Sequence, residues 1–179
     1  MIRLIAFAAM LLTAVAAVGS TESPYAGTET REIKALSAQE IAEYLNGGGL
    51  GFARAAELNR FPGPRHVLEL AGELELTAGQ AARTKAIFNA MKSRATSLGE
   101  ALVARERTLD QQFADGSIEK ASLQELMSAI GELQSEIRYV HLHAHLEQKS
   151  LLTKHQVRLY DELRGYWRTT DGAAREHSH

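Results

Sequence analysis

The residues best suited to chemistry in this chain are three histidines within one short stretch, residues 140–146, with the sequence VHLHAHL. On an α-helix, His141 and His145 lie one turn apart on the same face, whereas His143 points away and pairs with Glu147. Two imidazoles at this spacing can bind one Zn²⁺, Ni²⁺ or Cu²⁺ ion, because imidazole is a good ligand for all three metals. His141 and His145 are therefore candidate metal ligands.

A metal site needs more than two protein ligands, and the others would come from a neighbouring helix or a second subunit. The further candidates in the sequence are His66, His155, Glu100, Glu106 and Asp110. The competing interpretation is that the histidines are ordinary helix-surface or seam residues that bind no metal, and the sequence favours it. We therefore predict no cofactor, with Zn, Ni or Cu as the alternative.

No catalytic set is recognisable in the sequence. The chain has no cysteine, which removes thiolate nucleophiles, disulfides and cysteine-ligated metals together. There is no HExxH motif, and no serine or threonine lies in a nucleophile elbow. The formal net charge of −2 gives no indication of a nucleic acid or an anionic membrane as partner. We expect a protein that is not an enzyme.

The three histidines belong to the second of two long predicted helices. The first spans residues 77–113, and the second begins between residues 117 and 122 and ends near residue 150. Both carry apolar residues at three- and four-residue steps, as a packed helix does. The predicted seams include Phe113 and Met127, with Arg105 as the one charged interruption. Because Gly116 is placed to cap the first helix and few residues join the two, they should lie antiparallel as a hairpin.

A repeated phrase, LTxxQ, begins the first and the last predicted helices. Its defining residues are Leu76, Thr77, Gln80, Leu152, Thr153 and Gln156. In each copy the threonine oxygen can accept from the backbone N–H three residues later, and the glutamine can reach back to the threonine N–H, which is a capping box. The preceding leucine then packs on the next turn as a hydrophobic staple. Each phrase therefore predicts a helix start, and a looser copy at residues 36–40 predicts a third.

The first 19 residues have the pattern of a secretory signal peptide. Arg3 precedes an apolar run of about 15 residues, short of the roughly 20 that span a bilayer, and small residues follow it. The alternative is an uncleaved N-terminal anchor. Either interpretation places the rest of the protein outside the cytoplasm.

The remainder divides by composition. We predict a flexible linker at 20–35, short helices with Gly- and Pro-rich loops at 36–64, the hairpin domain at 65–168, and a disordered tail at 169–179. Short helices are expected at 37–45, 50–58 and 65–74, and the last helix at 154–168. No strand pattern of useful length occurs. The predicted fold is all-α: a long antiparallel hairpin with short N-terminal helices and a C-terminal helix.

The export leader, the helical hairpin and the two LTxxQ phrases together resemble the Spy/CpxP family of periplasmic proteins. That family also includes zinc-resistance-associated proteins and, more distantly, periplasmic cobalt and nickel sensors. The resemblance covers about residues 65–168 and rests on 76–80 and 152–156. It implies a periplasmic homodimer that binds unfolded or misfolded proteins without ATP, or that reports envelope stress to a membrane sensor.

Two departures from that family bear on function. Its chaperones are described as having a basic client-binding surface, whereas this chain is slightly acidic. Its metal sensors carry a histidine pair near the mature N-terminus, whereas residues 20–65 contain no histidine. The first hypothesis is therefore a chaperone or stress adaptor, and the alternative is a heavy-metal sensor or resistance protein that uses His141 and His145.

Overall fold

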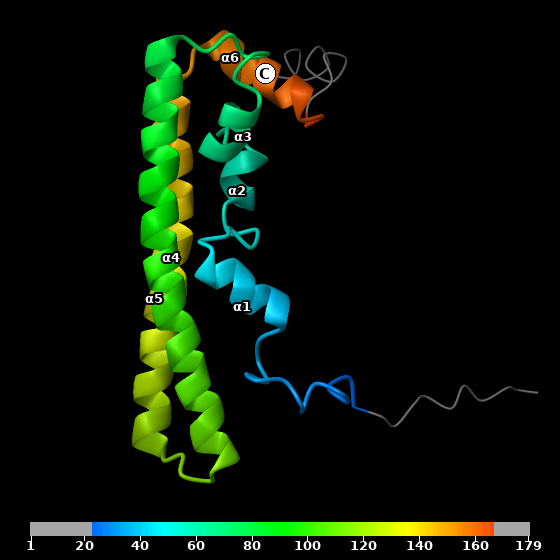
Figure 1. Ribbon diagram of the computed structural model, residues 1–179, viewed down its shortest axis with the longest axis vertical. Coiled ribbons are helices and arrows are strands. Elements are labelled where there is room, and N and C mark those ends of the chain that lie inside the picture. Colours follow the sequence, from blue (N-terminus) through cyan, green and yellow to red (C-terminus); the bar gives the residue numbers. More distant parts are fainter. Residues whose placement is uncertain (1–22, 167–179) are drawn as a thin grey trace, which may run out of the picture.

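The computed structural model describes residues 23–166 and is entirely helical there, with six helices and no strand (Figure 1). The two longest helices, α4 (Ala78–Ala114) and α5 (Lys120–Leu151), pack against each other along their length. We call α4 and α5 the long helix pair. The predicted signal peptide and C-terminal tail lie outside the described residues. Within 23–166, no helix combines the length and apolarity that crossing a lipid bilayer requires.

The three predicted capping boxes are present and explain where their helices begin. Thr77 Oγ1 accepts from the backbone N–H of Gln80 at 3.2 Å, and Gln80 Oε1 accepts from the backbone N–H of Thr77 at 3.1 Å. Thr153 and Gln156 form the same pair at the start of α6 (Lys154–Leu163), and Ser37 caps α1 (Ala38–Leu45). The side-chain partners satisfy N–H groups that the first helical turn leaves free.

The turn between the long helices is built on glycine, as predicted. Gly116 has φ +68°, a left-handed conformation that glycine adopts without steric cost. Its N–H donates to Phe113 O at 3.2 Å, and the N–H of Ser117 donates to Gln112 O at 3.0 Å, which closes the end of α4 as a Schellman motif.

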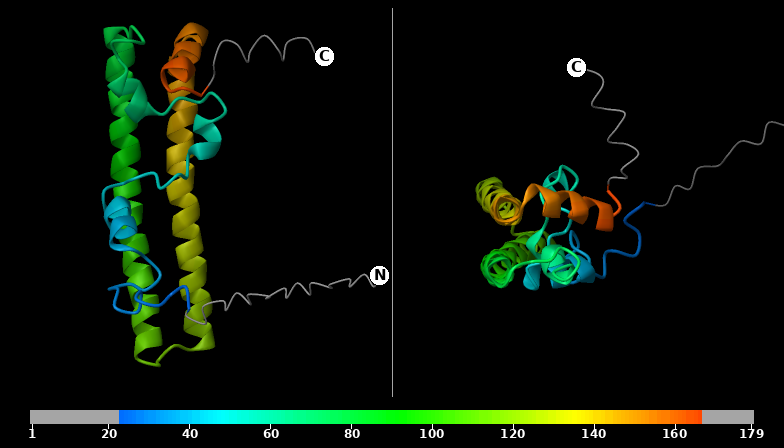
Figure 2. Two further views of the ribbon diagram at one scale, coloured as in Figure 1. Left: turned by 90° about the vertical axis from the view of Figure 1, so that its right-hand side faces the viewer. Right: turned by 90° about the horizontal axis from the view of Figure 1, so that it is seen from above.

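Residues 33–76, which we call the arm, run along one side of the long helix pair (Figures 1 and 2). The arm contains α1, α2 (Arg54–Glu57) and α3 (Pro64–Glu69). Helices α1 and α3 pack chiefly on α4, and α2 packs on α5. Helix α6 begins at the end of α5 that is upper in Figure 1 and extends to the side on which the arm lies.

Three predicted helices are shorter than expected, and for two of them a left-handed residue ends or delays the helix. The helix predicted at 50–58 is only Arg54–Glu57, since Leu50 and Gly51 have positive φ. The helix predicted at 65–74 ends at Glu69. The last helix ends at Leu163 and not at 168, because Gly165, at φ +72°, forms a second Schellman end.

Two separate apolar cores fix the arm, one against the long helix pair and the other against α6. The lower core joins Ile33 and Tyr44 of the arm to Leu98, Leu102, Val103, Ile130 and Ile137 of the pair. The upper core consists of Val67 and Leu74 of the arm with Tyr160 of α6. The predicted linker at 20–35 was wrong at its end, because Ile33 is fully buried.

The seam of the long helix pair differs from the prediction at three positions. Arg105 is exposed, and Glu106 takes the inward position with 8% of its surface accessible. Phe113 and Met127 are exposed and not in the seam. Glu106 turns inward because it follows the buried Leu102 by four residues, about one helical turn. Its burial raises the pKa of its carboxyl group.

Two glycines allow the arm to lie directly on the backbone of α4. A Cβ atom at Gly99 would collide with the main-chain carbonyl of Tyr44. A Cβ at Gly47, which has φ +67°, would lie 2.8 Å from Lys92 O. The contact between α1 and α4 therefore requires glycine at position 99 of α4 and at position 47, just after α1.

We predict that Gly99→Ala lowers the free energy of unfolding by about 1–3 kcal/mol, because α1 must move away from α4 to admit the methyl group. The matched control is Gly131→Ala in α5, where an added Cβ meets nothing within 4 Å. That change should stabilise by up to about 1 kcal/mol, because alanine favours helix. Urea denaturation of both variants measures the two effects, and equal effects would contradict the close contact.

Candidate functional site

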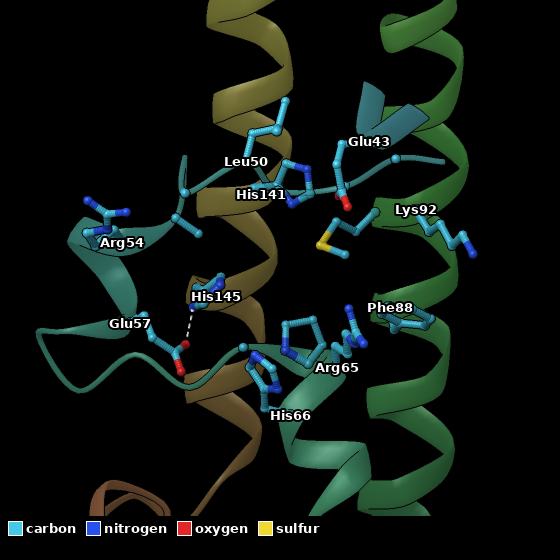
Figure 3. A pocket seen from close by; sticks show the side chains of 18 of the residues that line it. Glu43, Leu50, Arg54, Glu57, Arg65, His66, Phe88, Lys92, His141 and His145 are labelled. Atoms are coloured by element: carbon cyan, nitrogen blue, oxygen red, sulfur yellow. Dashed lines mark ion pairs between the residues drawn. The ribbon is translucent and has the colours of Figure 1, made fainter. Parts of the chain in front are cut away.

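A cleft of about 790 Å³ lies between the arm and the long helix pair, in the space between the two apolar cores (Figure 3). The arm bridges this space with residues 47–63. Both predicted metal ligands, His141 and His145, line it from α5, and Phe88 and Lys92 line it from α4. The cleft is therefore the place where the histidine pair, the glycine-rich loop and the Pro-Gly-Pro turn meet.

His145 is held in one tautomer by the arm. Its side chain is buried, with 7% exposed, and its Nδ1 lies 2.6 Å from Phe61 O. Because a carbonyl oxygen can only accept, Nδ1 carries the hydrogen and donates, which leaves a lone pair on Nε2. A Cβ at Gly63 would lie 2.9 Å from Cε1 of His145, so the glycine of the Pro-Gly-Pro turn makes room for the ring.

His141 lies one turn earlier and is also buried, with 5% exposed. Burial, and then the neighbouring His145, lower the pKa of His141, and only the main chain at Gly48 opposes this. The ring is therefore neutral at pH 7. Its Nε2 is buried without a hydrogen-bond partner, and a Cβ at Gly49 would lie 3.6 Å from its Nδ1. An unpartnered buried nitrogen costs free energy unless a ligand or water meets it.

The carboxylate of Glu57 connects the arm to α5 and α6, a role that no motif in the sequence indicated. Its Oε1 accepts from Tyr160 Oη at 2.5 Å and from Tyr166 Oη at 3.0 Å, and Arg164 Nε lies 3.6 Å away. Its Oε2 is 3.6 Å from Nδ1 of His145. Burial and this carboxylate raise the pKa of Tyr160, so its hydroxyl remains a donor. Glu57 lies on a helix of four residues, so no second functional residue at helical spacing marks it in the sequence.

The structure separates the predicted histidines. His143 faces the other side of α5, 3.5 Å from Glu147 as predicted and stacked on Tyr139. His155 is exposed on α6 and does not line the cleft. His66 does line the cleft, but its Nδ1 lies 2.8 Å from Oε2 of Glu69.

The acidic residues proposed as further ligands are too far along α4, and that prediction was wrong. Gln148 Nε2 donates to Thr84 Oγ1 at 3.1 Å, which sets the register of the helices and places residues 88–92 opposite the histidines. Glu100 lies about two helical turns beyond that segment, and Glu106 and Asp110 lie farther still. Within residues 23–166, no group of three or more His, Asp or Glu side chains is arranged to hold a metal ion.

The two LTxxQ glutamines meet, which sequence spacing did not reveal. Gln80 Nε2 donates to Gln156 Oε1 at 2.9 Å, and Gln156 Nε2 donates back to Gln80 Oε1 at 3.1 Å. Each amide also donates to a backbone carbonyl: Gln80 to Leu151 O at 3.0 Å and Gln156 to Leu74 O at 3.1 Å. The two capping boxes are thus one hydrogen-bonded unit that joins the starts of α4 and α6.

The face of the long helix pair turned away from the arm, which we call the outer face, carries a second and shallower groove of about 170 Å³. It is lined by Ile87, Ala90, Met91, Tyr139, Val140, His143, Ala144 and Glu147. Tyr139 is 64% exposed and Leu146, one residue from the groove, is 55% exposed. No described element covers this face (Figure 2).

Comparison with known proteins adds no relative. No protein-family model matches the sequence, and neither the curated proteins nor the solved structures include a significant match.

We predict that Gln156→Ala lowers the free energy of unfolding by about 1–3 kcal/mol, because it leaves the Leu74 carbonyl without its donor and removes both hydrogen bonds to the Gln80 amide. The double variant with Gln80→Ala should lose less than the sum of the single losses, with a coupling of about 0.5–3 kcal/mol. His155→Ala, an exposed position in the same phrase, is the control and should change stability by less than about 0.5 kcal/mol. Chemical denaturation measures these free energies. If the losses of the two single variants simply add up in the double variant, the amide pair is contradicted.

Proposed function

We propose that this protein is a periplasmic, ATP-independent chaperone or envelope-stress adaptor that binds unfolded or misfolded proteins on the outer face of the long helix pair. The observation that carries the proposal is the uncovered groove between α4 and α5, with Tyr139 and Leu146 exposed beside it. An exposed apolar surface on a helical protein is commonly a binding surface.

The chemistry of the outer face suits weak binding of many sequences. Ala90 and Ala144 are small and keep the groove shallow, so no single side chain is selected by shape. Met91 adds a flexible thioether that adapts to different partners. Arg94 and Glu136, 2.8 Å apart, supply both signs of charge across the two helices, so polar parts of a client also find partners.

Export to the periplasm and homodimer formation belong to the same proposal. Both are implied by the resemblance to the Spy/CpxP family, and a dimer that pairs the outer faces would bury part of the apolar surface. A membrane sensor is the partner expected for the adaptor role.

We predict that the double variant Tyr139→Ser/Leu146→Ser suppresses the aggregation of a denatured client about tenfold less effectively, because two exposed apolar contacts are lost. The matched control is Leu163→Ser, a comparably exposed leucine on α6, which should leave suppression unchanged. Light scattering of a chemically denatured client without nucleotide measures the effect. No suppression by the unaltered protein would reject the chaperone role and leave the adaptor role.

A second candidate function, a heavy-metal sensor or resistance protein, is favoured by the state of the two buried histidines. Nδ1 of His145 donates to a main-chain carbonyl, as in most metal-binding histidines, and Nε2 of His141 is unpartnered. The two rings lie one turn apart and both line the open cleft. Water or a second chain would have to complete the coordination.

For this candidate we predict that His141→Ala/His145→Ala lowers the affinity for Zn²⁺, Ni²⁺ or Cu²⁺ at least tenfold. His177 and His179 are replaced by serine in every protein compared, because that tail can bind metal nonspecifically. His143→Ala, on the other side of α5, is the control and should bind like the parent. Isothermal titration calorimetry gives the affinities, and an unchanged value in the double variant would exclude this cleft as the site.

A further inference from the structure

We propose that residues 33–46, the lower part of the arm and here called the cover, are a hinged intramolecular lid over an apolar groove of the long helix pair, and that an amphipathic helical segment of a client binds this groove when the cover swings away. The inference rests on the proposed client-binding function and adds a second, larger surface to it. The groove is the part of the lower core that α4 and α5 would expose if the cover moved away.

The groove exists because α4 and α5 present a continuous apolar row toward the cover. The row consists of Leu98, Leu102, Val103, Ile130 and Ile137, all buried. Ile33 and Tyr44 of the cover close it from one side. Removing the cover would expose this row, and an apolar surface of that extent is not stable in water without a partner.

The cover itself shows what kind of segment the groove accepts. In α1 only Ile41 and Tyr44 are not exposed, three residues apart on one helical face, and Ile33 and Leu36 pack on the same core from the turn before the helix. All other residues of α1 face solvent. The groove therefore fits a short helix with an apolar residue every three or four positions.

Charge at the start of the cover extends this description. Lys34 Nζ lies 2.9 Å from Asp110 Oδ2, and Glu32 Oε1 lies 2.6 Å from Arg107 Nη2. A client segment with mixed charges before its apolar residues can use the same carboxylate and guanidinium. Because Lys34, Glu32 and Arg107 are about half exposed, these ion pairs hold the cover only weakly.

A hinge lies directly after the cover. Gly47, Leu50 and Gly51 all have positive φ, within five residues. Beyond them the chain bridges the cleft and joins the upper core, which contains no residue of the cover. The cover can therefore rotate about residues 47–51 while α3, α6 and the amide pair of Gln80 and Gln156 stay in place.

The contact between the cover and the long helix pair also includes a buried charged residue. Glu106 is buried beside the lower core with 8% of its surface exposed, and opening would return its carboxyl group to water. On its far side the cover borders the open cleft. The contact is thus less favourable than an all-apolar interface would be, which suits a lid that opens.

The test uses the absence of cysteine from the chain. In Lys34→Cys/Asp110→Cys an oxidised disulfide locks the cover, because the main-chain N of Lys34 and Oδ1 of Asp110 are 2.9 Å apart, and reduction releases it. The probe is a fluorescent peptide with the sequence of residues 31–46. We expect the oxidised protein to bind it at least tenfold more weakly than the reduced protein. The control is Lys34→Ser/Asp110→Ser, which loses the same ion pair but has no thiol and should bind the peptide equally under oxidising and reducing conditions.

Equal peptide binding by the oxidised and reduced forms would overturn the hinged cover, whereas loss of client suppression in both forms would reject the proposed function. Hydrogen exchange of the unaltered protein gives a test that needs no variant. Amides 41–46 should exchange at least tenfold faster than the amides of α4 that face them. Exchange of both sets at the rate of global unfolding would also overturn the proposal.

Discussion

Two helices packed side by side bury the seam between them but leave the apolar residues beside it in contact with water, and the rest of this structure follows from that constraint. A pair of long helices leaves apolar rows on both sides of the line along which they touch. Here one side is covered by residues 33–76, which carry few regular turns but supply Ile33, Tyr44 and Val67 to two cores. The other side remains open to solvent. The two sides therefore differ in packing.

The arm covers its side at two places and not continuously, and this is what creates the cleft. Glycines at 47 and 99 bring α1 against α4, and the amide pair of Gln80 and Gln156 joins the other end of the arm to α6 through Leu74 O. Between these contacts residues 47–63 cross the cleft that His141 and His145 line. The carboxylate of Glu57, bonded to two tyrosines of the C-terminal segment, holds the span close to α5.

This arrangement places the two candidate chemistries on opposite sides of the same helix. His141 and His145 face the cleft, where both are buried, whereas Tyr139 and His143 face the open groove. A ligand in the cleft would contact the span that connects the cover to the upper core. Metal binding and client binding can therefore be separate properties of one helix pair, and variants on either face separate them.

The sequence by itself determined the features that depend on neighbours three or four residues away. Capping at Thr77 and Thr153, the turn at Gly116 and the shared face of His141 and His145 are set by local hydrogen bonds and helical periodicity. Tertiary structure alone decided that Gln80 meets Gln156, that Glu57 approaches His145, and that Glu106 and not Arg105 turns inward. Spacing along the chain fixes which residues share a face, but the register between helices depends on side-chain packing across many turns, which no short motif encodes.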